Sequence, residues 1–395
     1  MSVEWFDLGQ RLKASVVGAP VPKLCGAPLV PVPHPVAVRV SGRADRVRVS
    51  VATDTATDSG MGMDGLAALG RVGASLDSLE AWTLLIDSRA ALPVLIGLAR
   101  RCSDAGLEAV AALVGWWWDR ADFPGGRAVV NVVDGCRARW VTGRAPQSET
   151  AKVWLAAFGL PDSAQGLVGL HRLLVAGDTL PMLDLLAADD EFSHSVARTA
   201  LSDGSAWSRP DSVARAAVGL RSRCDAADLY GAALLADPLW RARQTHAGEV
   251  VTGRLVNEVT RGQWVVRVES ERLDARLRVG ADVRVWNGLP GDVDGPGRAW
   301  AGVVRDSAVV AGRLVLTVRL GVRTATIRQG EVLTLMPAPP SVYRQRSGRS
   351  TYRRLAYSRS SWLSTGRPPS PTRRSVPLDV LLAGAEEVAE PGGDC

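Results

Sequence analysis

Alternation of polar and apolar residues in the first half of the chain predicts strands interleaved with helices. Residues 46–52 (RVRVSVA) alternate strictly, as in a strand with one buried face, and residues 82–87 (WTLLID) form an apolar run of strand length. Residues 89–106 then have helical spacing and end at Gly106, a residue type that often follows a helix. This order of strand and helix indicates an α/β layer, which we place at residues 46–145.

The rest of this layer and the residues before it have weaker signals. Residues 107–118 are almost wholly apolar and end in three tryptophans, and we expect a second buried strand there. Residues 126–133 and 136–143 are expected to pair as a hairpin that turns at the Asp-Gly dipeptide between them. Residues 1–45 are rich in Pro, Gly and Val and are expected to be an irregular leader.

The second half of the chain changes from helical to strand-like spacing. Residues 146–245 predict a helical region, in which Asp162 and Gln165 resemble a capping box. Residues 246–336 contain strand-like runs about 8–12 residues apart, a spacing typical of a small antiparallel barrel. The predicted runs are 249–259, 263–270, 275–286, 298–306, 312–320 and 325–336.

The last segment, residues 337–395, has too few large aliphatic residues to offset the entropy of folding, so we expect a disordered tail. The predicted fold class is therefore α+β multidomain: an N-terminal α/β layer, a central helical region, a C-terminal small antiparallel β-barrel and a disordered basic tail. Hydrophobic residues make up 46% and charged residues 22% of the sequence, as in ordinary globular proteins.

Charge separates sharply within the tail. The net charge is +6, yet residues 337–377 hold nine arginines and no acid, and residues 378–395 hold five acids and no basic residue. The first 336 residues therefore carry only 6 − 9 + 5 = +2. The excess of Arg over Lys in the whole chain is typical of a high-GC bacterium, but that bias does not explain why acids vanish from one segment.

Arginines and aromatic rings alternate in this basic segment. Arginine binds phosphates and releases counterions, while aromatic rings stack on unpaired bases, and neither interaction requires a fold. We therefore predict a site for DNA or RNA there; a solvated linker, a site for acidic lipid or an acidic protein, and a frame-shifted gene end remain alternatives. The predicted nucleic-acid-binding residues are Arg344, Arg346, Arg349, Tyr352, Arg353, Arg354, Tyr357, Arg359 and Trp362.

A glycine-rich stretch gives the main enzymatic hypothesis. GMGMDG at residues 60–65 matches the GxGxxG pattern of dinucleotide sites, and Asp87 ends the next strand. The cofactor-binding residues would be Gly60, Gly62, Gly65 and Asp87. An ordinary glycine-rich loop is the alternative, because the strand before it ends too early for a tight turn.

Three other features have both a chemical and a structural interpretation. Residues 150–177 could form a helix-turn-helix, or simply two packed helices. Residues 189–194 (DDEFSH) gather carboxylates and an imidazole, although acids at a helix end are usually solvated. The tryptophans of residues 116–118 cannot all face one side, so they are either a packing anchor or a stacking platform. Within the barrel, tryptophans and arginines could add a binding face.

The sequence lacks the motifs of common enzymes. There is no GxxxxGK[ST], HExxH or GxSxG motif and no zinc-finger cysteine spacing, so we predict no metal, no cofactor and no catalytic residue and lean against an enzyme. The opening residues have no signal-like core, no run reaches membrane-spanning length, and five scattered cysteines favour a reducing cytoplasm. We therefore expect a cytoplasmic nucleic-acid-binding accessory protein with electrostatic, non-sequence-specific contacts. A nucleotide-dependent enzyme or a structural assembly protein that binds another protein are the alternatives.

Overall fold

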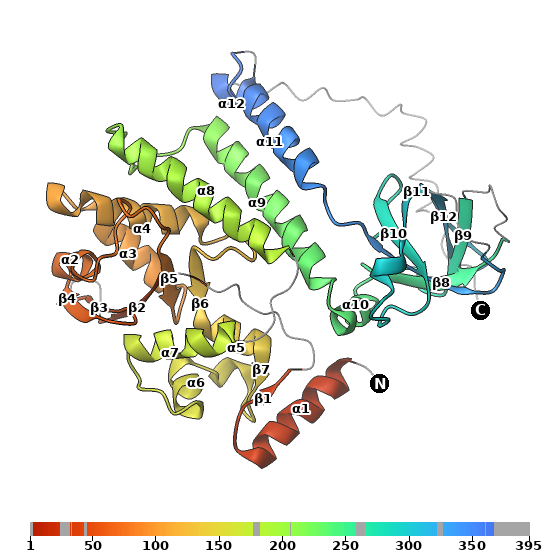
Figure 1. Ribbon diagram of the computed structural model, residues 1–395, viewed down its shortest axis with the longest axis horizontal. Coiled ribbons are helices and arrows are strands. Elements are labelled where there is room, and N and C mark those ends of the chain that lie inside the picture. Colours follow the sequence, from red (N-terminus) through yellow and green to blue (C-terminus); the bar gives the residue numbers. More distant parts are fainter. Residues whose placement is uncertain are drawn as a thin grey trace, which may run out of the picture.

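The computed structural model describes residues 3–23, 32, 34–42, 46–176, 182–205, 207–257, 265–321, 327–359 and 361–366. In this part of the chain, twelve α-helices and three β-sheets form a mixed α+β fold (Figure 1). No helix within these ranges has both the length and the hydrophobicity that crossing a bilayer requires.

The largest sheet in the N-terminal part has the strand order β4-β3-β2-β5-β6. The central strand β2 pairs in parallel with β5 and antiparallel with β3. Its strands are β2 (Pro35–Ser41), β3 (Arg48–Ala52), β4 (Thr57–Met61), β5 (Thr83–Ile86) and β6 (Val129–Asn131). The two stretches whose patterns predicted strands thus contain β3 and β5.

Helices cover both faces of this sheet. Leu84 and Ile86 pack into one core, whereas Leu85 between them packs into the other, because successive residues of a strand point to opposite faces. This arrangement explains the unbroken apolar run of β5. The first core is covered by α2 (Met63–Arg71), α3 (Ala91–Arg100) and α4 (Glu108–Arg120), and the second by α5 (Val132–Arg139), α6 (Ala151–Ala157) and α7 (Ala164–Val175).

Residues 107–118 form most of helix α4, so the strand expected there is wrong. The helix packs against α2 and α3 on one side and α8 on the other, and this burial on several sides removes the polar stripe that reveals helical spacing. Trp116 and Trp117 are buried, while Trp118 is 39% exposed. The Trp117 indole N–H donates to the Trp82 carbonyl oxygen at 2.9 Å, so two of the three tryptophans anchor α4 in the core.

The hairpin expected at residues 126–143 is also wrong. The short strand β6 runs directly into helix α5, and the Asp-Gly dipeptide lies inside that helix. The Asn131 side chain accepts hydrogen bonds from the backbone N–H groups of Val133 and Asp134 at 3.1 and 3.3 Å. This N-cap starts a helix where the strand-like valines suggested a strand.

The N-terminal leader is more regular than its composition suggests. Helix α1 (Val3–Val17) and strand β2 both lie within the 45 residues expected to be irregular. Strand β1 (Val21–Pro22) pairs antiparallel with β7 (Trp140–Val141) and so ties α1 to the body. Parallel pairing of β2 with β5 is a long-range contact that local composition does not encode.

The central helical region divides between two layers. Helices α6 and α7 cover the sheet, whereas α8 (Leu183–Ser202) and α9 (Val213–Leu234) pack against each other on the opposite side of α4 (Figure 1). Helix α10 (Pro238–Gln244) then leads into the C-terminal strands. Arg241 on α10 is buried and donates to the carbonyl oxygens of Leu235 and Asp292 at 3.0 and 2.6 Å, which joins the helices to the strand region.

The C-terminal strands pair antiparallel in a closed ring of six, in the order β10-β11-β12-β9-β8-β13. Buried and less buried residues alternate along β9 and β12, as the sequence pattern indicated, whereas four consecutive residues of β13 are buried. The strands are β8 (Val251–Leu255), β9 (Val265–Ser270), β10 (Asp282–Asn287), β11 (Trp300–Val310), β12 (Arg313–Leu320) and β13 (Val332–Pro337). Trp286 is buried where the ring meets Trp240 of α10.

The basic segment after the ring is helical where the structure describes it, so the expectation of disorder is wrong there. Helix α11 (Val342–Ala356) begins at Ser341, whose hydroxyl accepts a hydrogen bond from the Arg344 backbone N–H at 3.4 Å. Helix α12 (Trp362–Thr365) follows, and both helices pack against α9 (Figure 1). Residues 367–395, including the acidic end, lie outside the described residues.

His171 provides a test of this packing. It is buried in α7, where burial lowers the pKa of its imidazole to about 4 from an ordinary value of 6.5. The unfolded chain takes up this proton near pH 6.5 while the native state stays neutral, so stability falls between these two values as the pH drops. The whole difference is worth about 3 kcal/mol.

We predict that His171→Leu removes this part of the pH dependence. Urea unfolding of wild type and variant at about pH 7.5 and about pH 4.5 gives the comparison. An equal loss of unfolding free energy on acidification in both proteins contradicts the prediction.

Candidate nucleic-acid interface

Helix α11 packs against α9 through one face. Val342, Gln345, Arg349 and Ala356 recur at intervals of three, four and seven residues, which places them on one side of the helix. Gln345 and Ala356 are buried and Val342 packs against the apolar cluster of α8 and α9. A helix with an unusually polar composition therefore still has a docking face.

Arg349 forms the polar centre of this contact. Its Nε donates to Asp225 Oδ2 of α9 at 2.7 Å, and its Nη1 donates to Asp189 Oδ1 of α8 at 2.8 Å. Asp225 is buried, and its other oxygen lies 3.1 Å from Arg221 Nη2. Burial opposes ionisation of Asp189, but Arg120 and Arg349 outweigh it and hold the pKa of this carboxyl below its usual range.

The same network extends into the body. Arg120 of α4 donates to Asp190 Oδ1 at 2.7 Å and to Asp189 Oδ2 at 3.0 Å. Asp190 Oδ2 also accepts the backbone N–H of Arg127 at 2.6 Å. The carboxylates of DDEFSH are thus held by arginines and a backbone donor, and the described residues contain no cluster suited to a metal ion.

A groove of about 870 Å³ lies beside this network, between α4, α8, α9 and α11. Its α11 side presents Arg346, Ser350 and Arg353. Its other side presents mainly apolar groups, including Trp116, Phe192, Val196 and Trp207. The groove therefore combines cations with aromatic and aliphatic surface.

Some of the predicted nucleic-acid-binding arginines form ion pairs in the structure, and others do not. Arg349 is held by two carboxylates, and Arg344 lies 3.3 Å from Asp282 of the ring. Arg346, Arg353 and Arg359 are exposed and have no ion-pair partner among the described residues.

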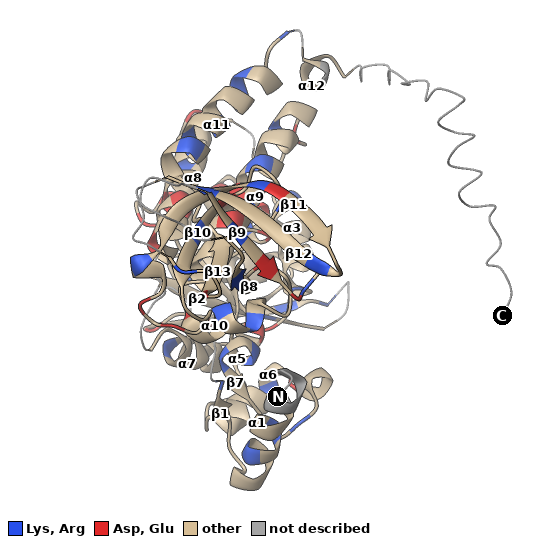
Figure 2. Ribbon diagram, turned by 90° about the vertical axis from the view of Figure 1, so that its right-hand side faces the viewer, with Lys and Arg blue, Asp and Glu red and all other residues tan. Residues whose placement is uncertain are grey.

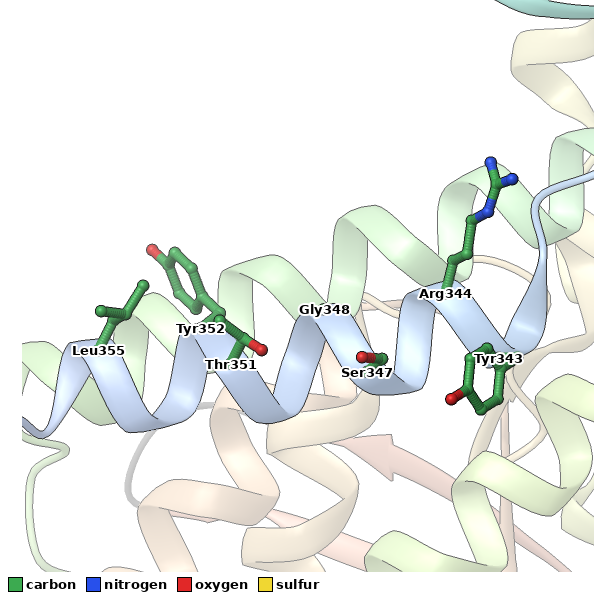
Figure 3. A pocket seen from close by; sticks show the side chains of 7 residues that line it. All are labelled: Tyr343, Arg344, Ser347, Gly348, Thr351, Tyr352 and Leu355. Atoms are coloured by element: carbon green, nitrogen blue, oxygen red, sulfur yellow. The ribbon is translucent and has the colours of Figure 1, made fainter.

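The other predicted residues differ in exposure. Arg354 is exposed and donates a hydrogen bond to the Thr351 hydroxyl at 3.4 Å. Tyr357 is 50% exposed, whereas Tyr352 is half-buried. The side chain of Trp362 lies outside the described residues. The outward face of α11 carries Tyr343, Arg344 and Tyr352 along a shallow depression (Figure 3).

The glycines of residues 60–65 form a tight strand-turn-helix. Gly60 is the second-to-last residue of β4, Gly62 adopts a φ of 55° before α2, and a Cβ on Gly65 would lie 2.8 Å from Val49. A Cβ on Gly60 would collide with Asp64, whose carboxylate occupies the first turn of α2 and pairs with Arg71 at 3.0 Å. A negative charge thus lies where a pyrophosphate would need positive potential.

Asp87 does not lie beside these glycines. Strands β3 and β2 separate β4 from β5, a distance of about 14 Å for three strand spacings. Asp87 is instead 3.0 Å from Arg39, which also contacts Asp162 at 2.6 Å. The glycines therefore serve close packing of α2, and the four predicted cofactor residues do not converge.

The two helices of residues 150–177 also have a structural role. Helix α7 packs on β2, β3 and β5, which covers the face a recognition helix would need free. His171 is buried, and Arg172 is 2.6 Å from Asp54. Ser163 caps α7 by accepting the Gly166 backbone N–H at 3.3 Å.

The strand ring contributes a mixed outer surface. Arg267, Arg305 and Arg319 are exposed on neighbouring strands, and none has an ion-pair partner among the described residues. Asp306 and Glu269 lie on the same strands, so positive and negative side chains alternate there (Figure 2). Of the tryptophans expected to form a binding face, Trp286 is in the core, Trp300 is partly buried and Trp264 lies outside the described residues.

The groove residues Phe192 and Trp207 had no signal in the sequence analysis. Phe192 lies on α8 four residues before Val196, and both are exposed, at 70% and 54%. An apolar pair at this spacing normally marks a core face, and only the packing of α8 shows that it lines a groove.

Comparison with protein-family models, curated proteins and solved structures finds no match.

The docking of α11 is open to a direct test. Arg349→Ala leaves the buried Asp225 carboxylate with only Arg221, and we predict a loss of about 3 kcal/mol in unfolding free energy. Trypsin should also cleave α11 after Arg353 faster. Denaturant titration and timed proteolysis with mass spectrometry measure both effects. Arg346→Ala, on the same helix without an ion pair, is the matched control; equal behaviour of the two variants contradicts the prediction.

Proposed function

We propose that this protein binds DNA or RNA without sequence specificity, mainly through arginines of the segment around α11. The observation that carries the proposal is the group of exposed arginines in and just after α11 that have no carboxylate partner among the described residues. This set, named the free arginines below, is Arg346, Arg353, Arg354 and Arg359.

Electrostatics supports this assignment. The helix α11 contains five arginines and no acid, and the structure uses Arg349 and Arg344 in ion pairs while the other three remain exposed. Cations that neutralise phosphates release condensed counterions, which gives affinity without a shaped site. A helix held on a folded body also presents its cations at fixed spacing, so binding costs less entropy than ordering a flexible chain.

The strand ring is a secondary contributor in this proposal. Its outer arginines lie on adjacent strands, yet acidic neighbours dilute their potential. A cytoplasmic location fits the free cysteines Cys102, Cys136 and Cys224 among the described residues.

The alternative functions have less support. A nucleotide-dependent enzyme would need the glycine turn and Asp87 to converge, and two strands lie between them. A purely structural role leaves the free arginines without a purpose, although an acidic protein partner could also use them.

The test replaces the free arginines by glutamine: Arg346→Gln, Arg353→Gln, Arg354→Gln and Arg359→Gln together. We predict at least a tenfold weaker affinity for oligonucleotides at low salt. The plot of log affinity against log salt concentration should become less steep. The magnitude of its slope should decrease by up to about 3, since four phosphate contacts are lost and each contributes about 0.7 on a single strand. Fluorescence anisotropy across a salt series measures both quantities.

The control variant removes the same number of positive charges from another part of the protein. Arg48→Gln, Arg89→Gln, Arg100→Gln and Arg101→Gln together alter four exposed arginines of the α/β layer. If this control weakens binding as much as the α11 variant, the proposed interface is wrong. Point variants are preferable to removal of α11, because removal would uncover the buried Asp225.

A further inference from the structure

The groove beside α11 has an apolar wall on which two large side chains remain exposed. Phe192 and Val196 lie one turn apart on α8, and their side chains are 70% and 54% exposed. Trp207 lies along the same wall, where its ring packs on Gly115 of α4. Exposed apolar side chains gathered in a concave surface indicate a binding site rather than a missing core.

The opposite rim of the groove is cationic. Arg346 and Arg353 are seven positions apart on α11, two helical turns or about 10.5 Å, and so lie on the same side. Ser350 lies between them, and neither arginine has an ion-pair partner among the described residues. Two acids line the groove: Asp189 is already paired with Arg120 and Arg349, and burial raises the pKa of the Asp119 carboxyl on the α4 wall, which favours its neutral form.

A buried amide lies where the two sides meet. Gln345 is 8% exposed and lines the groove; its Nε2 donates to the Asp225 carbonyl oxygen at 3.2 Å. Its Oε1 accepts no hydrogen bond within the described part of the chain. A buried acceptor without a donor costs free energy, so a bound donor there would be favourable.

We infer that this groove receives unpaired nucleotides, so that the ligand of the proposed function is single-stranded nucleic acid. Bases stack on Phe192 and the neighbouring apolar wall, while phosphates face Arg346 and Arg353. This inference rests on the proposed function and adds that the nucleic acid is single-stranded.

The chemistry of the two sides favours this occupant. An unpaired base offers an apolar ring face and a polar edge, and each base is joined to an anionic phosphate. In a duplex the ring faces are covered by neighbouring bases, so only the arginine rim would be used. The α11 side extends from Val342 to Arg353, about 16 Å of helix, which suits a few nucleotides. An acidic amphipathic helix of another protein has related chemistry, and the experiment distinguishes it.

The experiment compares a fluorescent oligothymidine of 12 nucleotides with a duplex of 12 base pairs, by anisotropy with the full-length protein. We expect wild type to bind the single strand more tightly at the same salt concentration. Phe192→Ala should weaken single-strand binding about tenfold, the usual effect of losing one stacked base, and leave duplex binding unchanged. Phe192→Trp should restore single-strand binding, because it retains a stacking ring.

Three further measurements serve as controls. Leu79→Ala removes an 83% exposed apolar side chain that does not line the groove and should change nothing. Photocrosslinking with an oligonucleotide carrying 5-iododeoxyuridine, mapped by mass spectrometry, should modify residues of α8 or Trp207. Circular dichroism melting confirms that each variant is folded.

The outcomes separate the two proposals. If the glutamine variant of the free arginines loses binding but Phe192→Ala does not, the groove inference is overturned and the proposed function stands. Crosslinks confined to residues outside the groove, or duplex binding at least as tight as single-strand binding, also overturn it. If wild type binds neither oligonucleotide but binds a synthetic acidic amphipathic peptide, both proposals fail and the groove is a protein-docking site.

Discussion

The buried carboxylate of Asp225 is the constraint on which the docking of α11, and with it the candidate interface, depends. An ionised carboxylate away from water is costly unless it is paired, and Arg349 of α11 supplies the partner. The same guanidinium reaches Asp189, which Arg120 ties to the sheet layer through α4. One chain of alternating charges therefore joins α4, α8, α9 and α11, and it fixes the position of a helix that has little apolar surface.

This docking determines which arginines are available for function. The helix carries its cations on every side, and the face toward α9 uses Arg349 internally. What remains is an exposed set along a rigid ridge, next to a groove whose other wall is aromatic and aliphatic. Positive charge is thus placed by the fold rather than by a flexible tail, and the spacing between Arg346 and Arg353 is set by helix geometry.

Glycines and tryptophans of the N-terminal half have a packing role. Gly60 and Gly65 leave room for α2 beside β4 and β3, Gly62 supplies the positive φ of the turn, and Trp117 fills the core beneath α4. A motif-like spacing and an unusual tripeptide both attract functional interpretations from sequence. In the structure they are explained by close approach of the backbone and by burial of large rings.

The sequence alone determined what depends on local spacing. The alternation in residues 46–52 and along the C-terminal strands indicated β3 and the six-stranded ring, since side chains of a strand alternate between core and solvent. The segregation of arginines after residue 336 was equally plain. Only the tertiary structure decided the rest. Helix α4 is covered on several sides, so its period was hidden, and α11 docks through the pairing of Arg349 with carboxylates more than a hundred residues away. Ion pairs between residues so far apart in sequence produce no periodic pattern along the chain, because the partners become neighbours only after folding.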